Sequence, residues 1–265
     1  MLTMGLHDDD CTMLIAAYQA PLLPSGSMGA INLIREQVRL CESRGVTMLC
    51  CPEGILGGLA DYAPGPGAYA IDVERGQLTA VLAPLASKTL TSILGFTEIR
   101  GGKLYNTAVV FQNGTVAGLY RKLHPAIRKS VYEPGDAISV FTVRDLTFGI
   151  VICNDSNFAE PARVMAEKGA TILFVPTNNG LPADRSHANL VSQTRGVDIG
   201  LAVEHRLAVI RADVAGRAGG LVSYGSSAIT DCTGVVIQSA PLLAEALLVA
   251  EIETAPRQRG ILAVS

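Results

Sequence analysis

Short apolar runs closed by proline, glycine or a polar residue recur along the chain and alternate with segments of helical period. The runs at residues 12–19, 46–51 and 91–98 have apolar centres, which predicts strands buried on both faces. Between the first two, apolar residues recur at helical spacing from 31 to 41, with Ser27 as the expected N-cap. A strand, a helix and a strand in this order predict a right-handed crossover and parallel pairing.

A hairpin signal stands near the middle of the chain. The runs at residues 104–111 and 115–122 flank Asn113-Gly114, and both turn residues tolerate positive φ, so we expect two antiparallel strands joined by a tight turn. The same criteria predict further strands at residues 141–143, 146–153, 171–175, 207–212, 226–231, 235–238 and 247–252. They predict helices near residues 76–85, from Pro161 to Gly169, and from Asp184, as N-cap, to about Glu204.

Composition narrows the fold class. The chain has 265 residues, 49% of them hydrophobic and only 17% charged, which is enough to bury a core in one large domain. No internal repeat, low-complexity block or linker interrupts the pattern. We therefore expect a single α/β domain over residues 12–265, preceded by a flexible leader at residues 1–11.

Charge and cysteine content exclude several classes of protein. A net charge of −3 without a run of Lys or Arg lacks the footprint that nucleic acid or anionic lipid needs, so neither is an expected partner. No uncharged apolar stretch reaches the roughly 18 residues of a membrane span. Six cysteines without a secretory signal, in a chain long enough to fold without disulfides, favour a cytoplasmic location.

Polar side chains close three of the apolar runs: Glu53, Lys122 and Cys153. Ligands bind at the carboxyl ends of strands in α/β sheets, so these side chains are candidates for chemistry. Each also has an ordinary structural interpretation, as a solvated glutamate, a solvated lysine and a small buried thiol. Taken one at a time, none identifies a site.

Taken together, the three residues resemble the catalytic triad of the nitrilase superfamily of carbon–nitrogen hydrolases, and the match covers nearly the whole chain. The family's glutamate motif is similar to residues 51–54, its middle block to residues 105–108 and 120–124, and its cysteine motif to residues 153–163. The separations also resemble the family: 69 residues from Glu53 to Lys122 (122 − 53) and 31 from Lys122 to Cys153 (153 − 122).

The resemblance implies an α-β-β-α sandwich, two central mixed sheets flanked by helices, in a homodimer or larger assembly without a cofactor. It also implies roles for the triad. A free thiol has a pKa of about 8.5, so attack by Cys153 needs a base. Glu53 would take that proton and pass it to the leaving amine. Lys122 and the backbone amide of Asn154 would stabilise the oxyanion.

The chain departs from the family pattern beside the nucleophile. Asn154 stands where an aromatic residue is common and Ala159 where proline is common, so we expect Asn154 and Phe158 to shape an unusual substrate pocket. Nitrile-hydrolysing members usually continue the cysteine with Trp-Glu, whereas Asn154-Asp155 here favours amides. Many members carry a second active-site glutamate after the lysine, and Glu133 is the candidate for it.

A late block of the chain also resembles the family. His205 and Asp213 stand there at positions where asparagine is more usual, so we take this block as support for the fold rather than for chemistry. His124 is an alternative base for Cys153 in a Cys/His pair. The adjacent Cys50 and Cys51 lack metal-ligand spacing, so we expect no metal.

The leading hypothesis is a thiol amidohydrolase that cleaves a small linear amide or N-carbamoyl compound. The alternatives are a nitrilase acting on a small nitrile and a catalytically silent α/β binding protein with the same fold.

Overall fold

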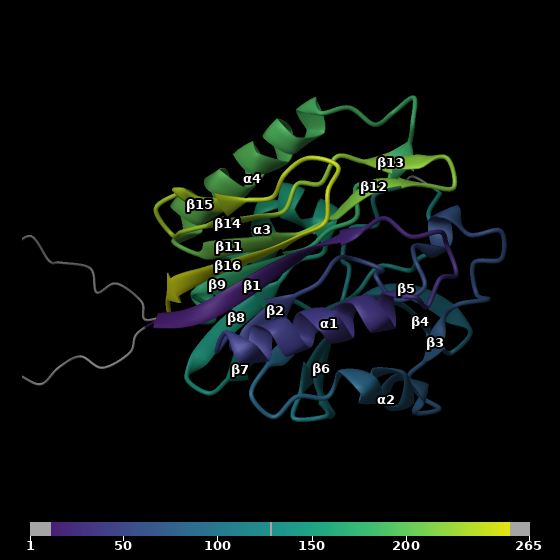
Figure 1. Cartoon of the computed structure of the whole chain (residues 1–265), viewed down its shortest axis with the longest axis horizontal. Helices are drawn as coiled ribbons and strands as arrows, with labels where there is room; N and C mark the ends of the chain where they lie inside the picture. Colours follow the sequence, from purple (N-terminus) through teal and green to yellow (C-terminus); the bar gives the residue numbers. More distant parts are fainter. Residues whose placement is uncertain (1–11, 128, 255–265) are drawn as a thin grey trace, which may run out of the picture.

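The structure is a computed structural model that describes residues 12–127 and 129–254, and the leader predicted at residues 1–11 lies outside this range. Figure 1 shows the course of the chain. The strands are β1 (Thr12–Pro21), β2 (Met48–Cys50), β3 (Ile71–Asp72), β4 (Thr91–Arg100), β5 (Lys103–Gln112), β6 (Thr115–Arg121), β7 (Val140–Val143), β8 (Leu146–Ile150), β9 (Ile172–Pro176), β10 (Leu181–Pro182), β11 (Ala208–Ala212), β12 (Val214–Ala218), β13 (Leu221–Ser223), β14 (Ala228–Thr230), β15 (Val236–Ser239) and β16 (Ala246–Glu253). The α-helices are α1 (Ala30–Ser43), α2 (Gln77–Leu82), α3 (Ala159–Glu167) and α4 (Asn189–His205), and the short 3₁₀ helices are η1 (Ala60–Tyr62), η2 (Ala83–Leu85) and η3 (Cys153–Asn157).

The strands form two mixed sheets that lie face to face. The first has the order β10-β13-β12-β1-β2-β4-β5-β6, with β16 paired to β1 and β3 paired to β4. The second has the order β15-β14-β11-β9-β8-β7. As the crossover rule predicts, β1 and β2 are parallel, whereas β4, β5 and β6 form an antiparallel meander.

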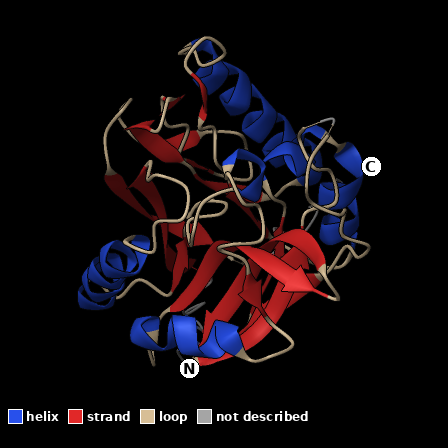
Figure 2. Cartoon of the chain, turned by 90° about the vertical axis from the view of Figure 1, so that its right-hand side faces the viewer, coloured by secondary structure: helices blue, strands red, loops and turns tan. Residues whose placement is uncertain are grey.

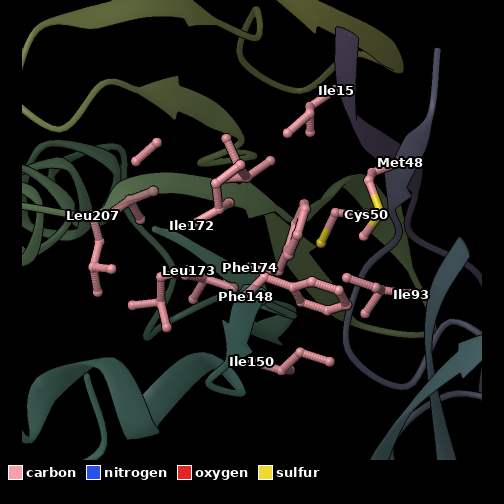
Figure 3. Packing of buried hydrophobic residues seen from close by; sticks show 14 of the residues in the cluster. Ile15, Met48, Cys50, Ile93, Phe148, Ile150, Ile172, Leu173, Phe174 and Leu207 are labelled. Atoms are coloured by element: carbon pink, nitrogen blue, oxygen red, sulfur yellow. The ribbon is translucent and has the colours of Figure 1, made fainter. Parts of the chain in front are cut away.

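The main hydrophobic core lies between the two sheets (Figure 3). Ile15, Met48 and Ile93 point into it from the first sheet, and Phe148 and Phe174 point into it from the second. All five side chains are fully buried, so their removal from water stabilises the face-to-face packing. Glu53 follows β2 and Cys153 follows β8. Because these strands pack against each other through this core, the core fixes the relative position of the two residues.

Helices cover the outer faces of the sheets (Figure 2). Ile34, Val38 and Cys41 of α1 pack in a second core against the first sheet, together with α2. Met165 of α3 and Leu201 of α4 pack against the second sheet. The expected α-β-β-α sandwich in a single domain is therefore confirmed.

Several local predictions are confirmed and others are wrong. Asn113 and Gly114 form the predicted hairpin turn, with φ of 51° and 73°. Ser27 is not the N-cap of α1, because the residue that precedes the helix is Gly29. The Ser27 Oγ accepts a hydrogen bond from the Gly29 N–H at 3.2 Å. Asp184 does not cap α4, because the chain first pairs as β10 and then turns, with Arg185 N donating to Pro182 O at 2.8 Å.

The strand predicted at residues 146–153 ends earlier, at Ile150. The Ile152 N–H donates to the carboxylate of Asp155 at 3.1 Å rather than to another strand. Sequence periodicity also missed the β12–β13 hairpin, because its strands are short and surround Gly219 and Gly220.

Candidate active site

Glu53 is oriented by contacts from both sheets. It follows β2, and only 2% of its surface is exposed. Its Oε1 accepts hydrogen bonds from Asn106 Nδ2 at 2.8 Å and from Lys122 Nζ at 2.5 Å. Its Oε2 accepts one from the Asn178 N–H at 3.0 Å, and its own N–H donates to Thr177 O at 3.3 Å. Since Asn106 and Lys122 belong to the first sheet and Asn178 follows β9 of the second, the carboxylate sits between the sheets.

The turn that carries Glu53 lies directly against Gly95 of β4. A Cβ atom at Gly95 would lie 2.4 Å from Gly54 N, 2.6 Å from Pro52 O and 2.7 Å from Glu53 Cα. These neighbours are backbone atoms, so they cannot move aside without moving Glu53. Glycine is required here because two backbone segments approach closely.

Lys122 follows β6 and reaches Glu53 as a buried cation. The backbone N–H of Lys122 donates to the backbone O of Asn106 at 2.8 Å, which continues the β5–β6 pairing. Only 4% of the Lys122 surface is exposed. Burial alone would lower the lysine pKa, but the Glu53 carboxylate and Cys153 oppose burial, and the net shift of the Lys122 pKa is upward. Lys122 therefore stays charged and forms a buried ion pair with Glu53.

Cys153 lies at a sharp backbone bend shortly after β8, a strand of the second sheet. It begins η3 with a φ of 45°, a left-handed conformation that non-glycine residues seldom adopt. Conformations of this kind cost about 1–3 kcal/mol and cluster at functional sites. Ser156 Oγ donates to Cys153 O at 2.7 Å and stabilises the bend. The bend ends the strand and places the thiol on a cavity wall.

The buried carboxylate of Asp155 ties the cysteine segment to the lysine segment. It accepts hydrogen bonds from Ile152 N at 3.1 Å on one side. On the other side it accepts from Tyr120 Oη at 3.0 Å and from the N–H groups of Leu123 at 3.4 Å and His124 at 2.7 Å. Burial raises the Asp155 pKa, although these donors and the Lys122 charge oppose the rise. One side chain thus sets the spacing between the two segments.

The Cys153 thiol is neutral in the resting site. Burial and the Glu53 carboxylate raise its pKa to about 12, against the opposing effect of Lys122. Its Sγ lies 4.0 Å from Asn179 Oδ1, within hydrogen-bonding range for sulfur. A thiol in this state can act as a nucleophile only if a neighbouring base removes its proton during attack.

Asn179 is locked in one amide orientation by Asp213. The Asp213 carboxylate accepts hydrogen bonds from Asn179 N and Asn179 Nδ2, each at 3.0 Å, and from Ser226 N and Ser226 Oγ at 2.9 and 2.7 Å. Burial raises the Asp213 pKa, and the bonds from Ser226 and Asn179 oppose the rise. Because the Asn179 amide nitrogen faces Asp213, its carbonyl oxygen faces the Cys153 thiol.

A fully buried ion pair lies behind the thiol. Arg211 of β11 donates to both carboxylate oxygens of Asp198 on α4, with Nη2 at 2.5 Å from Oδ1 and Nε at 2.9 Å from Oδ2. The same guanidinium donates to Thr177 Oγ1 at 2.7 Å and to Ser156 Oγ at 3.1 Å. Arg211 therefore supports both the segment beside Glu53 and the segment that begins at Cys153.

Two cavities meet at Cys153. The larger, of about 440 Å³ and called the main cavity below, is lined by Glu53, Lys122 and Cys153 together with apolar and aromatic side chains such as Leu59. The smaller, of about 260 Å³, lies toward α4 and is lined by Cys153 and Asn154 among others. The main cavity alone presents a nucleophile, a carboxylate and an ammonium group on one wall.

The other residues predicted for the site lie outside the main cavity. Glu133 is at the surface, where its carboxylate is 3.8 Å from Lys103 Nζ. Phe158 is 43% exposed and stacks on His124, with ring centroids 3.7 Å apart. Asn154 donates from Nδ2 to His124 O at 3.1 Å and lines the smaller cavity. The His124 ring lines neither cavity, so the geometry gives no support to a Cys/His pair.

Within residues 12–127 and 129–254, no group of three or more His, Cys, Asp or Glu side chains is arranged to hold a metal ion. Over the same ranges, no helix is long and apolar enough to cross a membrane. Cys41, Cys50, Cys51, Cys153 and Cys232 are free thiols.

Sequence reasoning missed the polar residues that orient the three candidates. Asn106 and Asp213 were seen only as parts of family blocks, and Asn178, Asn179 and Arg211 were not singled out. A signal existed for Arg211, because a charged residue inside the apolar run 207–212 needs a buried partner. The partners of the asparagines come from segments far apart in the chain and carry no comparable signal.

Comparison with known proteins shows which family this sequence matches. A family model described as carbon-nitrogen hydrolase matches residues 14–259. The chain is 34% identical over 184 residues to a nitrilase of Pyrococcus abyssi, covering 68% of this chain and 66% of that protein. It is 31% identical over 229 residues to the omega-amidase NIT2 of Danio rerio, covering 80% and 79%.

Solved structures give the same result. The crystal structure of a carbon-nitrogen hydrolase from Helicobacter pylori G27 matches with a TM-score of 0.77 and 25% identity, over 92% of this chain and 89% of that one. The family match spans nearly the whole of the sequence, and the fold agrees with it. The chain therefore belongs to the carbon-nitrogen hydrolase family of enzymes.

Proposed function

We propose that the protein is a cofactor-independent thiol amidohydrolase that cleaves the C–N bond of a small linear amide or N-carbamoyl compound. The observation that carries the proposal is the placement of a neutral thiol, a fixed carboxylate and a buried ammonium group on one cavity wall. The omega-amidase name of a relative that covers 80% of this chain supports amides as the substrate class.

The reaction begins when Glu53 takes the proton of the Cys153 thiol as Sγ bonds to the substrate carbonyl carbon. The carbonyl π electrons move to oxygen, and the Lys122 ammonium and the Asn154 N–H stabilise the resulting oxyanion. Protonated Glu53 then gives its proton to the leaving nitrogen. The C–N bond breaks, ammonia leaves, and a thioester remains on Cys153.

Deacylation uses the same groups in reverse order. Glu53, again ionised, takes a proton from water as the water oxygen attacks the thioester carbonyl. The C–S bond breaks, the acid is released, and the proton returns to the Cys153 sulfur. Glu53 can serve both half-reactions because Asn106, Lys122 and the Asn178 N–H hold its carboxylate in one position.

The thioester gives the most direct test. We expect intact-protein mass spectrometry after brief incubation with a panel of small amides to show an acyl adduct, mapped to Cys153 by peptide digestion. Cys153→Ala should abolish both the adduct and ammonia release, whereas Cys232→Ala, which removes another partly exposed free thiol, should change neither. An adduct that persists in Cys153→Ala would contradict the mechanism.

Substrate comparison separates the alternatives. A nitrilase would release ammonia from a nitrile faster than from the matched amide, whereas an amidohydrolase shows the opposite order. A silent binding protein would release no ammonia from any member of the panel and would leave Cys153 without an adduct.

The contact between Gly95 and the Glu53 turn yields a further expected result. Gly95→Ala should lower the free energy of unfolding by roughly 1–3 kcal/mol, as overpacking does. It should also lower the rate of ammonia release by roughly 100-fold, because the added Cβ displaces Glu53. The control is Gly67→Ala, since an added Cβ there has nothing within 4 Å. Urea denaturation and steady-state rates measure the two effects. Wild-type activity in Gly95→Ala would show that the turn tolerates displacement.

A further inference from the structure

Asn179 lies where the two cavities meet beside Cys153, and it lines both of them. Its Oδ1 lies 4.0 Å from Cys153 Sγ, and within the described part of the chain this thiol is the one donor beside that oxygen. A thiol is a weak hydrogen-bond donor. The Asn179 oxygen is therefore an acceptor that a stronger donor can use.

The neighbouring Asn178 has no such free acceptor. Its Oδ1 accepts a hydrogen bond from the Gly180 N–H at 3.0 Å, and its Nδ2 donates to the backbone O of Glu53 at 3.3 Å. Both ends of the Asn178 amide are engaged with backbone. Of these two adjacent amides, that of Asn179 presents an oxygen to the nucleophile.

The orientation of the Asn179 amide is set by the fully buried carboxylate of Asp213. Asp213 Oδ1 accepts hydrogen bonds from Asn179 N at 3.0 Å and Val214 N at 2.8 Å, and Asp213 Oδ2 accepts one from Asn179 Nδ2 at 3.0 Å. A reversed Asn179 amide would set its oxygen against this carboxylate, and two acceptors would then face each other without a hydrogen between them. The oxygen is thus held toward Cys153.

The polar groups of a primary amide match the groups around Cys153. Such an amide has one acceptor oxygen and two N–H hydrogens. In the proposed reaction Lys122 and the Asn154 N–H receive the oxygen, and Glu53 faces the nitrogen because it protonates it. One N–H hydrogen is left without a partner. The substrate nitrogen is one bond from the carbon that Cys153 attacks, so an oxygen beside Sγ is within its reach.

We propose that the Asn179 side-chain oxygen, held by Asp213, accepts a hydrogen bond from the leaving –NH₂ group of the substrate. The site then selects substrates whose leaving group carries N–H hydrogens over esters of the same acid. The inference rests on the proposed amidohydrolase function and adds a specificity-determining residue to it. A site built to receive an N–H rejects an analogue that lacks one, because the acceptor is then left unpaired.

A matched pair of substrates tests the contact in Asn179→Leu, which keeps a side chain of similar size. The pair is butanamide and methyl butanoate, or, for another amide of the panel, the methyl ester of the same acid. We expect kcat/KM for the amide to fall roughly 5-fold to 100-fold, the usual effect of an unpaired polar group. It should not fall for the ester, whose leaving oxygen carries no hydrogen. Release of the acid measures both reactions.

Two controls accompany this variant. Asn32→Leu makes the same change at an exposed position of α1, outside the lining of both cavities, and should alter neither substrate. Far-UV circular dichroism and melting temperature verify that each variant is folded.

Asp213→Asn tests the orientation while Asn179 is kept. Two backbone N–H groups, of Asn179 and Val214, point at the Oδ1 position, whereas one, of Ser226, points at the Oδ2 position. The introduced amide should therefore keep its oxygen at the first position and its nitrogen at the second. The Asn179 amide then reverses and turns its own N–H toward Cys153. We expect slower amide hydrolysis but faster alkylation of Cys153 by iodoacetamide at a fixed pH, because an N–H donor stabilises the thiolate.

The outcomes separate this inference from the proposed function. If Asn179→Leu slows amide and ester equally, or slows neither, the leaving-group contact is overturned while the amidohydrolase function stands. If Asp213→Asn changes neither hydrolysis nor alkylation, Asp213 does not set the orientation, and the inference fails as stated. If the wild type yields neither ammonia nor a Cys153 adduct with any amide of the panel, the proposed function fails and the inference falls with it.

Discussion

Replacing Glu53 with Gln should lower kcat for amide hydrolysis roughly 10²–10⁴-fold, the usual contribution of a general acid–base. The Cys153 pKa of about 12 leaves almost no thiolate at neutral pH, so attack depends on transfer of its proton to Glu53. Gln has nearly the same shape and keeps a hydrogen-bonding side chain, but it cannot take a proton. Steady-state ammonia release and the rate of thioester formation measure the loss.

The pH dependence of this variant distinguishes a lost base from a disturbed fold. Removing the Glu53 charge removes one cause of the raised Cys153 pKa, but burial remains, so the pKa stays above its ordinary value. Below that pKa, each unit of pH raises the thiolate fraction tenfold. The residual rate of Glu53→Gln should therefore climb steeply between about pH 7 and 9, in contrast to the wild-type rate.

Glu133→Gln is the matched control, because Glu133 lies at the surface beside Lys103 rather than in the main cavity. It should retain wild-type kcat and pH dependence. Equal losses in Glu133→Gln and Glu53→Gln, or a flat pH profile in Glu53→Gln, would remove Glu53 from the role of base.

The largest effect on stability is expected for Arg211→Met. The substitution leaves the Asp198 carboxylate, which is 1% exposed, without its ion-pair partner. Removing one member of a buried pair costs roughly 3–5 kcal/mol, because the remaining charge is neither solvated nor paired. For a chain of this size, the melting temperature should fall by roughly 10 °C. Calorimetry or thermal circular dichroism measures the shift.

A double variant and a surface control complete this test. Arg211→Met combined with Asp198→Leu should recover part of the lost stability, because no charge is then left buried. Arg163→Met breaks an ion pair with Glu167 in which both side chains are more than half exposed, and it should cost less than about 1 kcal/mol. A loss in Arg211→Met no larger than in Arg163→Met would show that the buried pair is not a stability determinant.

Apolar runs closed by turn signals predict the α/β class and the positions of most strands, whereas the two-sheet sandwich was implied by the resemblance to a family. Asn113-Gly114 fixes the β5–β6 hairpin, and that hairpin carries Lys122 to the site. Glu53, Lys122 and Cys153 are found because each ends such a run and because their order and separation resemble a family.

Contacts between distant segments cannot be predicted in the same way. Asp155 joins two segments through backbone N–H groups, which every residue except proline possesses, so no residue pattern marks the partners. Glu133 was proposed because many members of the resembling family carry a second glutamate after the lysine, but in this chain Glu133 lies at the surface beside Lys103. Phe158 lies five residues after Cys153, yet η3 turns it outward to stack on His124.

The candidate triad is divided between the two sheets, with Glu53 and Lys122 on the first and Cys153 on the second. Neither sheet holds all three groups of the proposed mechanism, so we expect a refolding chain with both sheets formed but not yet packed together to be inactive. Recovery of activity therefore reports on the docking of the sheets, whereas far-UV circular dichroism reports on their formation. In a refolding time course, any interval between the two signals is the lifetime of the undocked state.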